Sequence, residues 1–454
     1  MVTATESRLA GLKQRIDSRE AQIGIVGMGY VGLPLALLFS GERFRVTGFD
    51  IEPGKVETLN SGGSYIVRIL PSEIHEAQKA GFRATADYSE IARMDAVIIC
   101  VPTPLNEHHE PDLSYVTGTV ESIAPWLHEG QLVVLESTTY PGTTEEVVVP
   151  LLEAGNPSGL KASRTLDQPG VHVAFSPERE DPSNPDSQLG LIPKVVGGLT
   201  PACLQSAMEL YGRAIKTMVP VASCRVAEAA KLLENIFRGV NIALINELKV
   251  VYQAMGIDIW EVIEAAKTKP FGFMPFYPGP GLGGHCIPID PFYLTWKARE
   301  FSQHTRFIEL AGEINTAMPQ YVIDRVVEAL NARRKAMNGS RVLLLGLAYK
   351  PDVDDERESP SYVLLNLLQE RRAEVAYYDP HVPVIRPTRE HSHWTGLRSI
   401  GWDRQAIESF DAVIIATHHR GVNYQELADW NSCIVDTRNV MAAFETKPGQ
   451  VWKA

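Results

Sequence analysis

The sequence predicts an α/β protein with two doubly wound, Rossmann-like domains joined by a helical central domain that contains one long helix. Three observations predict this fold. Short apolar segments of the buried parallel type alternate with helical segments in the first and last parts of the chain. A glycine-rich turn follows the first apolar segment. An uninterrupted helical pattern from residue 225 to about residue 255 separates the two α/β parts.

The first α/β part opens with a strand, a glycine turn and a helix in the order of a dinucleotide-binding unit. The strand candidate Gln22–Val26 is followed by the turn Gly27-Met-Gly29-Tyr30-Val31-Gly32 and by helix-like residues. The glycines permit a tight turn, close approach of a pyrophosphate and packing of helix on strand. The second strand ends at Asp50, an acid placed to bind the adenosine ribose, which favours NAD over NADP. The predicted NAD-binding residues are Gly27, Gly29, Tyr30, Val31, Gly32 and Asp50.

Two further buried strand candidates, residues 95–102 and 131–136, each end in a polar turn. Ligands of open α/β sheets bind outside the carboxyl ends of the strands, so these turns should border the nicotinamide. Thr103 and Glu136 are therefore added to the predicted cofactor site. Cys100 lies inside an apolar strand and is interpreted as buried packing rather than as a reactive thiol.

The long helix carries Glu228, Lys231 and Asn235 at spacings that place them on one face. Such a polar stripe is commonly a solvated face, and that alternative stays open here. Apolar residues occur almost all round the later turns, which predicts a buried or dimer-forming helix.

The last α/β part begins near Ser340, with a strand that runs into a loop over residues 341–350, strand candidates at 374–379 and 411–417 and a helix at 361–369. Its order mirrors the first part without a second glycine fingerprint, which predicts a nucleotide bound on each side of a cleft. The charged loop 350–359 is either a solvated turn or a binding loop. The predicted domains are residues 1–215, 216–318 and 319–454.

Cys286 lies in a segment, residues 278–293, that is too rich in Gly and Pro for a helix or a central strand. A cysteine on such a loop is either a small buried hydrophobe or a displayed nucleophile. The neighbouring His285 does not make a zinc site, because a second spaced pair of ligands is missing. We predict no metal.

Composition excludes several classes of protein. The 454 residues carry a net charge of −12, which argues against nucleic acid as a partner. Five cysteines without a CxxC pair fit a reducing compartment. We see neither a signal peptide nor a long apolar span, so we expect a cytoplasmic protein without a membrane partner.

Five motifs in order along the chain resemble the nucleotide-sugar 6-dehydrogenases of the UDP-glucose/GDP-mannose dehydrogenase superfamily. They are Gly27-x-Gly-Tyr-Val-Gly32, Ser176-Pro-Glu-Arg179, Lys231-x-x-x-Asn235, Gly283-Gly-His-Cys-Ile-Pro-Ile-Asp290 and Lys350-x6-Arg357-Glu-Ser. The resemblance implies NAD as cofactor, a UDP-sugar as substrate and a homodimer or higher homo-oligomer. It also implies oxidation of a primary alcohol to a carboxylate with two NAD.

The resemblance assigns roles to residues. Cys286 would form a thiohemiacetal and then a thioester, while Lys231 and Asn235 surround the developing oxyanion. Asp290 and Glu178, with Thr138, would order or activate water, and the identity of the base stays open. Arg357 would meet the cofactor. The residues implied in binding the substrate are Glu178, Arg179, Lys231, Asn235, Gly283 and Lys350.

Within the superfamily, the segment from Lys269 to Cys286 looks most like that of bacterial UDP-N-acetylglucosamine 6-dehydrogenases of surface-polysaccharide synthesis. UDP-glucose enzymes of the family carry Ser where this chain has His285. UDP-N-acetylmannosamine, UDP-N-acetylgalactosamine and UDP-glucose remain alternative substrates. A binding subunit that has lost its chemistry, or a dehydrogenase that stops after two electrons, are the alternatives from other classes.

Overall fold

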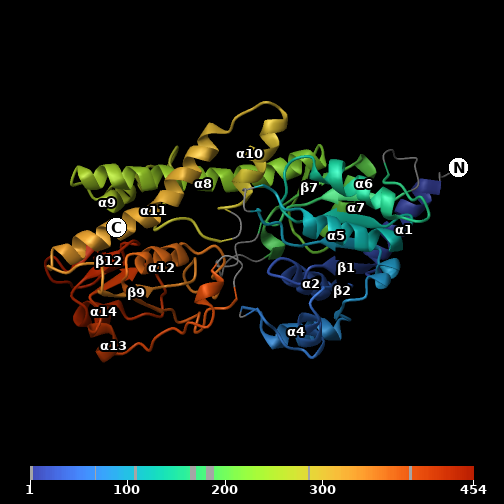
Figure 1. Ribbon diagram of the computed structural model, residues 1–454. Helices are drawn as coiled ribbons and strands as arrows, with labels where there is room; N and C mark the ends of the chain where they lie inside the picture. Colours follow the sequence, from blue (N-terminus) through green and yellow to red (C-terminus); the bar gives the residue numbers. More distant parts are fainter. Residues whose placement is uncertain are drawn as a thin grey trace. The chain divides into compact units, whose positions relative to one another are not determined.

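The computed structural model describes residues 4–66, 68–106, 110–163, 170–179, 189–284, 287–387 and 391–454, with side chains from residue 11 onward. The chain forms two compact units. The first comprises Met1–Glu234 and Trp296–Gln303, and the second comprises Asn235–Thr295 and His304–Ala454. Figure 1 shows the helices and strands of both units.

The first unit contains an eight-stranded sheet in the order β3-β2-β1-β4-β5-β6-β7-β8. All neighbouring strands are parallel except β6 and β7, which are antiparallel. The first six strands therefore have the strand order of a dinucleotide-binding fold. The strands are β1 Gln22–Val26, β2 Arg45–Phe49, β3 Arg83–Thr85, β4 Ala96–Ile99, β5 Leu132–Leu135, β6 His172–Phe175, β7 Lys194–Gly198 and β8 Met218–Val221.

Helices cover both faces of this sheet, as the alternation of buried residues along β4 requires. Ile98 packs in one core with Phe39 of α2, whereas Val97 and Ile99 pack in a separate core with Val120 of α5. The unit is thus doubly wound. Its helices are α1 Ala4–Asp17, α2 Gly32–Gly41, α3 Pro53–Asn60, α4 Pro71–Lys79, α5 Ser114–Ile123, α6 Val149–Gly155 and α7 Pro201–Tyr211.

The second unit contains a five-stranded parallel sheet in the order β10-β9-β11-β12-β13. Leu344 of β9 packs in one core with Leu365 of α12, whereas Leu343 and Leu345 pack in another with Leu427 of α14. The elements are α9 Ile259–Lys267, α11 Arg306–Asn331, β9 Arg341–Leu345, α12 Pro360–Glu370, β10 Glu374–Tyr378, α13 Arg404–Glu408, β11 Ala412–Ile415, α14 Tyr424–Trp430, β12 Ile434–Asp436 and β13 Val451–Lys453.

Two helices, α8 Cys224–Ala254 and α10 Asp290–Glu300, each contain one of the three points at which the chain passes between units, and the third lies between Gln303 and His304. Within the second unit, buried amides tie α8 to α11. The Asn246 Nδ2 donates to Asn315 Oδ1 at 2.9 Å, and Asn315 Nδ2 donates to the Gly239 carbonyl at 3.1 Å. These bonds satisfy polar groups that would otherwise be costly to bury.

The structure confirms the predicted α/β fold with two parallel-sheet parts and a long central helix, and the predicted helix and strands agree with the observed elements within a few residues. Strands β3, β6, β7 and β8 of the first sheet and β12 and β13 of the second were not identified from the sequence. None of the helices in the described part of the chain has the length and apolarity needed to cross a bilayer.

Candidate active site

The glycine turn after β1 has the geometry that a bound pyrophosphate needs. Gly27 has φ +94°, and a Cβ there would lie 2.5 Å from the Cys100 carbonyl oxygen. A Cβ on Gly32 would lie 1.9 Å from the Gly27 carbonyl oxygen, so the start of α2 packs directly on the turn. A Cβ on Gly29 would meet no atom within 4 Å, which leaves its backbone open to a ligand. Gly27 and Gly32 form the turn, and a role of Gly29 in binding phosphates stays a prediction.

Asp50, directly after β2, keeps acceptor capacity for a ribose. Its Oδ2 accepts the Met28 amide at 2.9 Å and its Oδ1 accepts the Glu52 amide at 3.0 Å. A carboxylate offers about four acceptor positions, so about two remain for two ribose hydroxyls. The Lys55 ammonium lies 3.7 Å from Oδ2. The bond to Met28 also fixes Asp50 relative to the glycine turn.

The other predicted cofactor residues, apart from Arg357 of the second unit, lie on the first unit. Arg68 Nη2 donates to the Tyr30 carbonyl at 3.2 Å, Val31 is half-buried and Thr103 is buried. Cys100 is buried, and burial raises the pKa of its thiol well above the ordinary value. Cys100 is therefore packing, as the sequence indicated.

Glu136, at the end of β5, is buried within a polar cluster. Its Oε1 accepts the Tyr211 hydroxyl at 2.5 Å and lies 3.0 Å from the Lys194 ammonium. Burial raises the pKa of Glu136 although Lys194 opposes the shift. Neither partner was predicted, but a lysine at the head of the apolar segment Lys194–Gly198 is a signal that could have marked a buried ion pair. A cofactor role for Glu136 stays a prediction.

Helix α8 organises two loops of the first unit. Glu228 is buried and accepts hydrogen bonds from the Gly142 amide at 2.6 Å and the Thr144 amide at 2.9 Å. These bonds hold the turn that follows Thr138, which is half-buried. The carboxylate of Glu228 was noted in the sequence only as part of a polar stripe.

One turn later, buried Lys231 donates from Nζ to the Glu178 backbone carbonyl at 2.5 Å. Arg179 forms an ion pair with Glu234, with 2.7 Å between Nη2 and Oε1, and donates from Nη1 to the Pro193 carbonyl at 2.5 Å. The predicted residues Glu178, Arg179 and Lys231 are thus brought together. The solvated-face alternative is wrong for Glu228 and Lys231.

In the second unit, Asn235 and Asp290 are in direct contact. The buried Asn235 donates from Nδ2 to Asp290 Oδ2 at 2.5 Å, and the Arg238 guanidinium donates to Asn235 Oδ1. Asp290 is the first residue of α10 and is also buried. The amide is therefore oriented from both sides. Arg238 was not predicted, although it lies one turn after Asn235 on the same helix.

The glycine loop that precedes Cys286 packs on the second unit too closely for larger residues. A Cβ on Gly283 would lie 2.7 Å from Tyr349 Cβ and 2.9 Å from Pro360 Cδ. Gly284 has φ +85°, its Cβ would lie 2.7 Å from the Tyr349 ring, and its amide donates to the Arg357 carbonyl at 3.2 Å. Cys286 and His285 lie outside the described residues.

The charged loop 350–359 is an ordered part of this packing. Arg357 makes a bidentate pair with Asp355, with distances of 2.9 and 2.7 Å, and the Lys350 ammonium lies 5.6 Å from the Tyr349 ring centre. The solvated-turn alternative is wrong for three of the five acids of this loop, because Asp354, Asp355 and Glu356 are buried, whereas Asp352 is half-buried and Glu358 is exposed.

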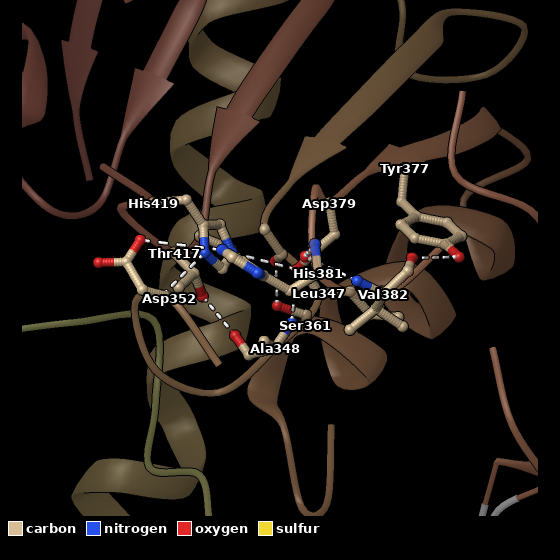
Figure 2. A network of polar contacts seen from close by, with 12 residues as sticks. Leu347, Ala348, Asp352, Ser361, Tyr377, Asp379, His381, Val382, Thr417 and His419 are labelled. Atoms are coloured by element: carbon tan, nitrogen blue, oxygen red, sulfur yellow. Dashed lines mark hydrogen bonds and ion pairs between the residues drawn. The ribbon is translucent and has the colours of Figure 1, made fainter. Parts of the chain in front are cut away.

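Asp379, at the end of β10, corresponds in position to Asp50 but has a different environment (Figure 2). Its Oδ2 accepts from the Leu347 and Ala348 amides at 2.7 and 2.9 Å and from His419 Nε2 at 3.1 Å. Its Oδ1 accepts from the His381 and Val382 amides at 2.8 and 3.1 Å. Burial alone would raise the pKa of Asp379, but these bonds outweigh it and lower the pKa. The acceptor positions of this carboxylate are filled by its own chain.

Asp352, His381 and His419 lie close together in the same view, with potential ligand atoms within 4.8 Å of one another. The Asp352 amide donates to His419 Nδ1 at 3.1 Å, so the proton of this ring lies on Nε2 and is donated to Asp379. Both nitrogens of His419 are therefore engaged, and the group gives no support for a metal site.

Comparisons with known proteins cover nearly the whole chain. Residues 21–215, 225–317 and 343–443 match the NAD binding, central and UDP binding domains of the UDP-glucose/GDP-mannose dehydrogenase family. A UDP-N-acetyl-D-glucosamine 6-dehydrogenase of Pseudomonas aeruginosa is 37% identical over 88% of this chain and 91% of its own. A UDP-N-acetyl-D-mannosamine dehydrogenase of Escherichia coli K12 is 36% identical over 88% and 94%. The solved UDP-D-ManNAc dehydrogenase of Pyrococcus horikoshii is 32% identical, with a TM-score of 0.82 over 92% of this chain and 95% of that one.

Proposed function

Because the chain belongs to the UDP-glucose/GDP-mannose dehydrogenase family, we propose that it oxidises the C6 alcohol of UDP-N-acetyl-D-glucosamine to the carboxylate with two NAD. It is an NAD-dependent nucleotide-sugar 6-dehydrogenase acting on UDP-N-acetyl-sugars. The observation that carries the choice of glucosamine is the 37% identity to an enzyme of that name over 88% of the chain. The product would serve surface-polysaccharide synthesis.

The described residues fit the cofactor. The open backbone at Gly29 and the remaining acceptor positions of Asp50 match a pyrophosphate and a ribose diol. When bound there, NAD accepts the hydride that leaves C6 in each of the two oxidations. We assign Glu136, Thr103, Tyr30, Val31 and Arg357 to the same cofactor site as predictions.

The cysteine explains how a second oxidation becomes possible. Loss of a hydride and a proton from the alcohol gives an aldehyde, whose carbon carries only one hydrogen. The Cys286 thiolate adds to this carbon, and the oxygen takes a proton, which gives a thiohemiacetal. Loss of a second hydride and a proton leaves a thioester. Water then attacks the thioester carbon, the C–S bond breaks, and the acid and the free thiol are released.

The other assigned residues would stabilise negative charge on the C6 oxygen or position the water that cleaves the thioester. Lys231 and Asn235 would stabilise negative charge on the C6 oxygen, where one well-placed donor contributes about 3–4 kcal/mol. The bond from Asn235 to Asp290 restricts the amide before the substrate arrives. Asp290, Glu178 and Thr138 are the candidates for ordering or activating the water that cleaves the thioester.

The nucleotide end of the substrate is assigned to the glycine loop and the last domain. We propose that Gly283, Lys350 and Arg179 contact the UDP-sugar and that the functional domains are residues 1–215, 216–318 and 319–454. The family match to a UDP binding domain over residues 343–443 supports the assignment of Lys350. We further propose that the protein is a homodimer or higher homo-oligomer and that it is located in the cytoplasm.

A substrate panel tests this proposal. We expect the highest kcat/KM with UDP-N-acetylglucosamine, compared with its mannosamine and galactosamine counterparts and with UDP-glucose, and two NADH formed per sugar. A higher kcat/KM with another sugar would show that the proposed substrate is wrong, but the proposed oxidation at C6 would still hold. One NADH per sugar would exclude the thioester route, and no NADH with any sugar would indicate a binding subunit without chemistry.

A further inference from the structure

Lys194 is the first residue of β7 and lies beside the segment that carries Glu178. Strands β6 and β7 are antiparallel, with Phe175 opposite Gly197. Continued past the end of β6, this register brings Glu178 and Lys194 near each other. Because β6 ends where β7 begins, both residues lie at the carboxyl edge of β5 and β6, the edge at which ligands of this kind of sheet bind.

Three side chains join the segment around Glu178 to the start of β7, each by a bond to a backbone carbonyl. They are Ser176 Oγ to the Val195 carbonyl at 2.8 Å, Lys194 Nζ to the Pro177 carbonyl at 3.5 Å and Arg179 Nη1 to the Pro193 carbonyl at 2.5 Å. The Lys194 contact is long, so it acts mainly through the charge of the ammonium on the carbonyl dipole. The next carbonyl, that of Glu178 itself, accepts from Lys231. Two lysines therefore hold two successive carbonyls at Glu178.

The Lys194 side chain is itself held in place by Glu136 and Tyr211. Its Nζ lies 3.0 Å from Glu136 Oε1 and 4.9 Å from the Tyr211 ring centre, and the Tyr211 hydroxyl donates to the same Oε1 at 2.5 Å. Lys194, Glu136 and Tyr211 are 5, 1 and 0% exposed. A lysine in this position cannot turn away without leaving a buried carboxylate unpaired, which is costly. Its ammonium therefore has one well-defined place beside Pro177.

Glu178 belongs electrostatically to the same cluster. Burial raises the pKa of Glu136, the Lys194 ammonium lowers it, and the Glu178 carboxylate raises it again. A like charge has this effect only when it is close. The cluster thus places the Lys194 ammonium beside two carboxylates, that of Glu136 through a direct ion pair and that of Glu178 through the neighbouring backbone.

From these contacts we propose that Lys194, supported by Glu136 and Tyr211, is a positioning residue for Glu178. This inference rests on the proposed function, in which Glu178 orders or activates the water that cleaves the thioester. In that step water attacks the thioester carbon, the C–S bond breaks, and the sugar acid and the free thiol are released. The two hydride transfers come before the water attacks. Loss of Lys194 should therefore slow hydrolysis more than it slows formation of the thioester.

The test is rapid mixing of full-length Lys194→Met with saturating NAD and UDP-N-acetylglucosamine, or with the sugar that replaces it in the substrate panel. NADH is followed by absorbance, and the sugar acid by quenching and chromatography. We expect a burst of two NADH per subunit and then a slow phase, with steady-state acid formation lower than in the wild type by roughly tenfold to a hundredfold. Mass spectrometry of the quenched protein should show the sugar attached to Cys286 during the slow phase.

Two further variants separate positioning from stability. Arg15→Met is the matched control, because Arg15 pairs at 2.9 Å with the buried carboxylate of Asp95, which precedes β4 at the opposite edge of the same sheet. It should give no burst and keep the wild-type rate of acid formation. Glu136→Gln combined with Lys194→Met removes both charges of the buried pair, so it tests the inference even if the single variant does not fold. The double variant should show the same burst, because the Pro177 carbonyl still lacks its ammonium.

The outcomes distinguish this inference from the proposed function. Acid formation at the wild-type rate by the Lys194 variants, or an equal loss of hydride transfer and hydrolysis, would overturn the positioning role and leave the dehydrogenase activity standing. A burst of the same size in Arg15→Met would also overturn it, because any loss of a counter-ion in the sheet would then slow hydrolysis. A wild-type protein that forms no NADH would instead overturn the proposed function on which the inference rests.

Discussion

At the scale of single residues, four of the five cysteines differ from Cys286, the cysteine that is proposed to react with the substrate. Cys100, Cys203, Cys224 and Cys433 are buried, and burial raises the pKa of each thiol above its ordinary value. A thiol with a raised pKa is a poor nucleophile at neutral pH. These four cysteines are therefore unsuited to attack an aldehyde, which leaves Cys286 as the nucleophile of the proposal.

Replacement of Cys286 tests that assignment directly. We expect Cys286→Ser to lower net formation of the sugar acid by at least about a thousandfold, because serine has no sulfur to form a thioester and its hydroxyl is a weak nucleophile at neutral pH. Acid formation is measured by chromatography and NADH by absorbance. Cys224→Ser is the matched control, since its Sγ contacts the Gly197 carbonyl at 3.5 Å and a serine hydroxyl keeps that contact. Near-normal acid formation by Cys286→Ser would refute the thioester route.

Single residues also show which parts of the candidate site could be predicted from the sequence and which could not. The placement of Gly27, Gly32 and Asp50 around one turn was predictable because strand, turn and acid lie within one short stretch of chain and follow a local rule. The partners of Glu136 were not predictable, because Lys194 and Tyr211 come from a later strand and helix and meet it only after folding. Local geometry is encoded in spacing, whereas buried charge pairs depend on the tertiary fold.

At the scale of elements, the glycine loop before Cys286 is fixed by close packing rather than left free. Gly284 combines a φ of +85° with a Cβ position 2.7 Å from the Tyr349 ring. The first feature costs an L-residue about 1–2 kcal/mol, and the overlap adds about 1–3 kcal/mol. The described part of the loop, up to Gly284, is therefore tightly packed on the second unit.

Gly284→Ala should lower both stability and turnover. We expect a loss of about 2–5 kcal/mol in the unfolding free energy, the sum of the two costs, and a reduced kcat, because the displaced loop moves the nucleophile. Urea unfolding and initial rates measure the two effects. Gly396→Ala is the matched control, since Gly396 has φ +86° but no atom within 4 Å of its Cβ position. If both variants lose the same stability and activity, packing against Tyr349 contributes nothing.

The contacts of the long central helix were the hardest to predict from the sequence. The long helix was predicted from its apolar pattern, but its role in holding loops was not. Glu228 caps the turn at residues 142–144 and Lys231 holds the turn at Glu178, and both turns come from distant parts of the chain. Charged residues on a helix usually indicate solvent, so only the fold distinguishes these buried contacts from a solvated face.

At the scale of the whole molecule, helix α8 presents a continuous apolar stripe to solvent. Its exposed apolar residues recur at intervals of seven and four, which aligns them along one side of the helix. They are Val226, Leu233, Phe237, Leu244, Val251 and Met255, exposed by 45, 67, 46, 51, 45 and 63%. Contiguous apolar surface of this kind is typical of an interface, and a second copy of the chain is the partner that we predict from the family resemblance.

The double substitution Leu244→Glu and Val251→Glu should convert the predicted dimer to a monomer. Two charges on each side of a symmetric interface oppose association, because each copy contributes the same stripe. Sedimentation or light scattering at micromolar concentration measures the mass. Glu247→Gln on the same helix changes a neighbouring exposed residue and should remain dimeric. A monomeric wild-type protein at these concentrations would contradict the dimer.

The difference between Asp50 and Asp379 has a consequence for the order of events in a catalytic cycle. Asp379 is saturated by its own chain, so in the described part of the molecule Asp50 is the strand-end carboxylate that is suited to a dinucleotide. Two oxidations served by one such site cannot occur with two cofactors bound side by side. On the proposed thioester route, the spent cofactor would leave and a fresh one would enter while the half-oxidised sugar stays attached, and a covalent bond to sulfur is well suited to hold the sugar during that exchange.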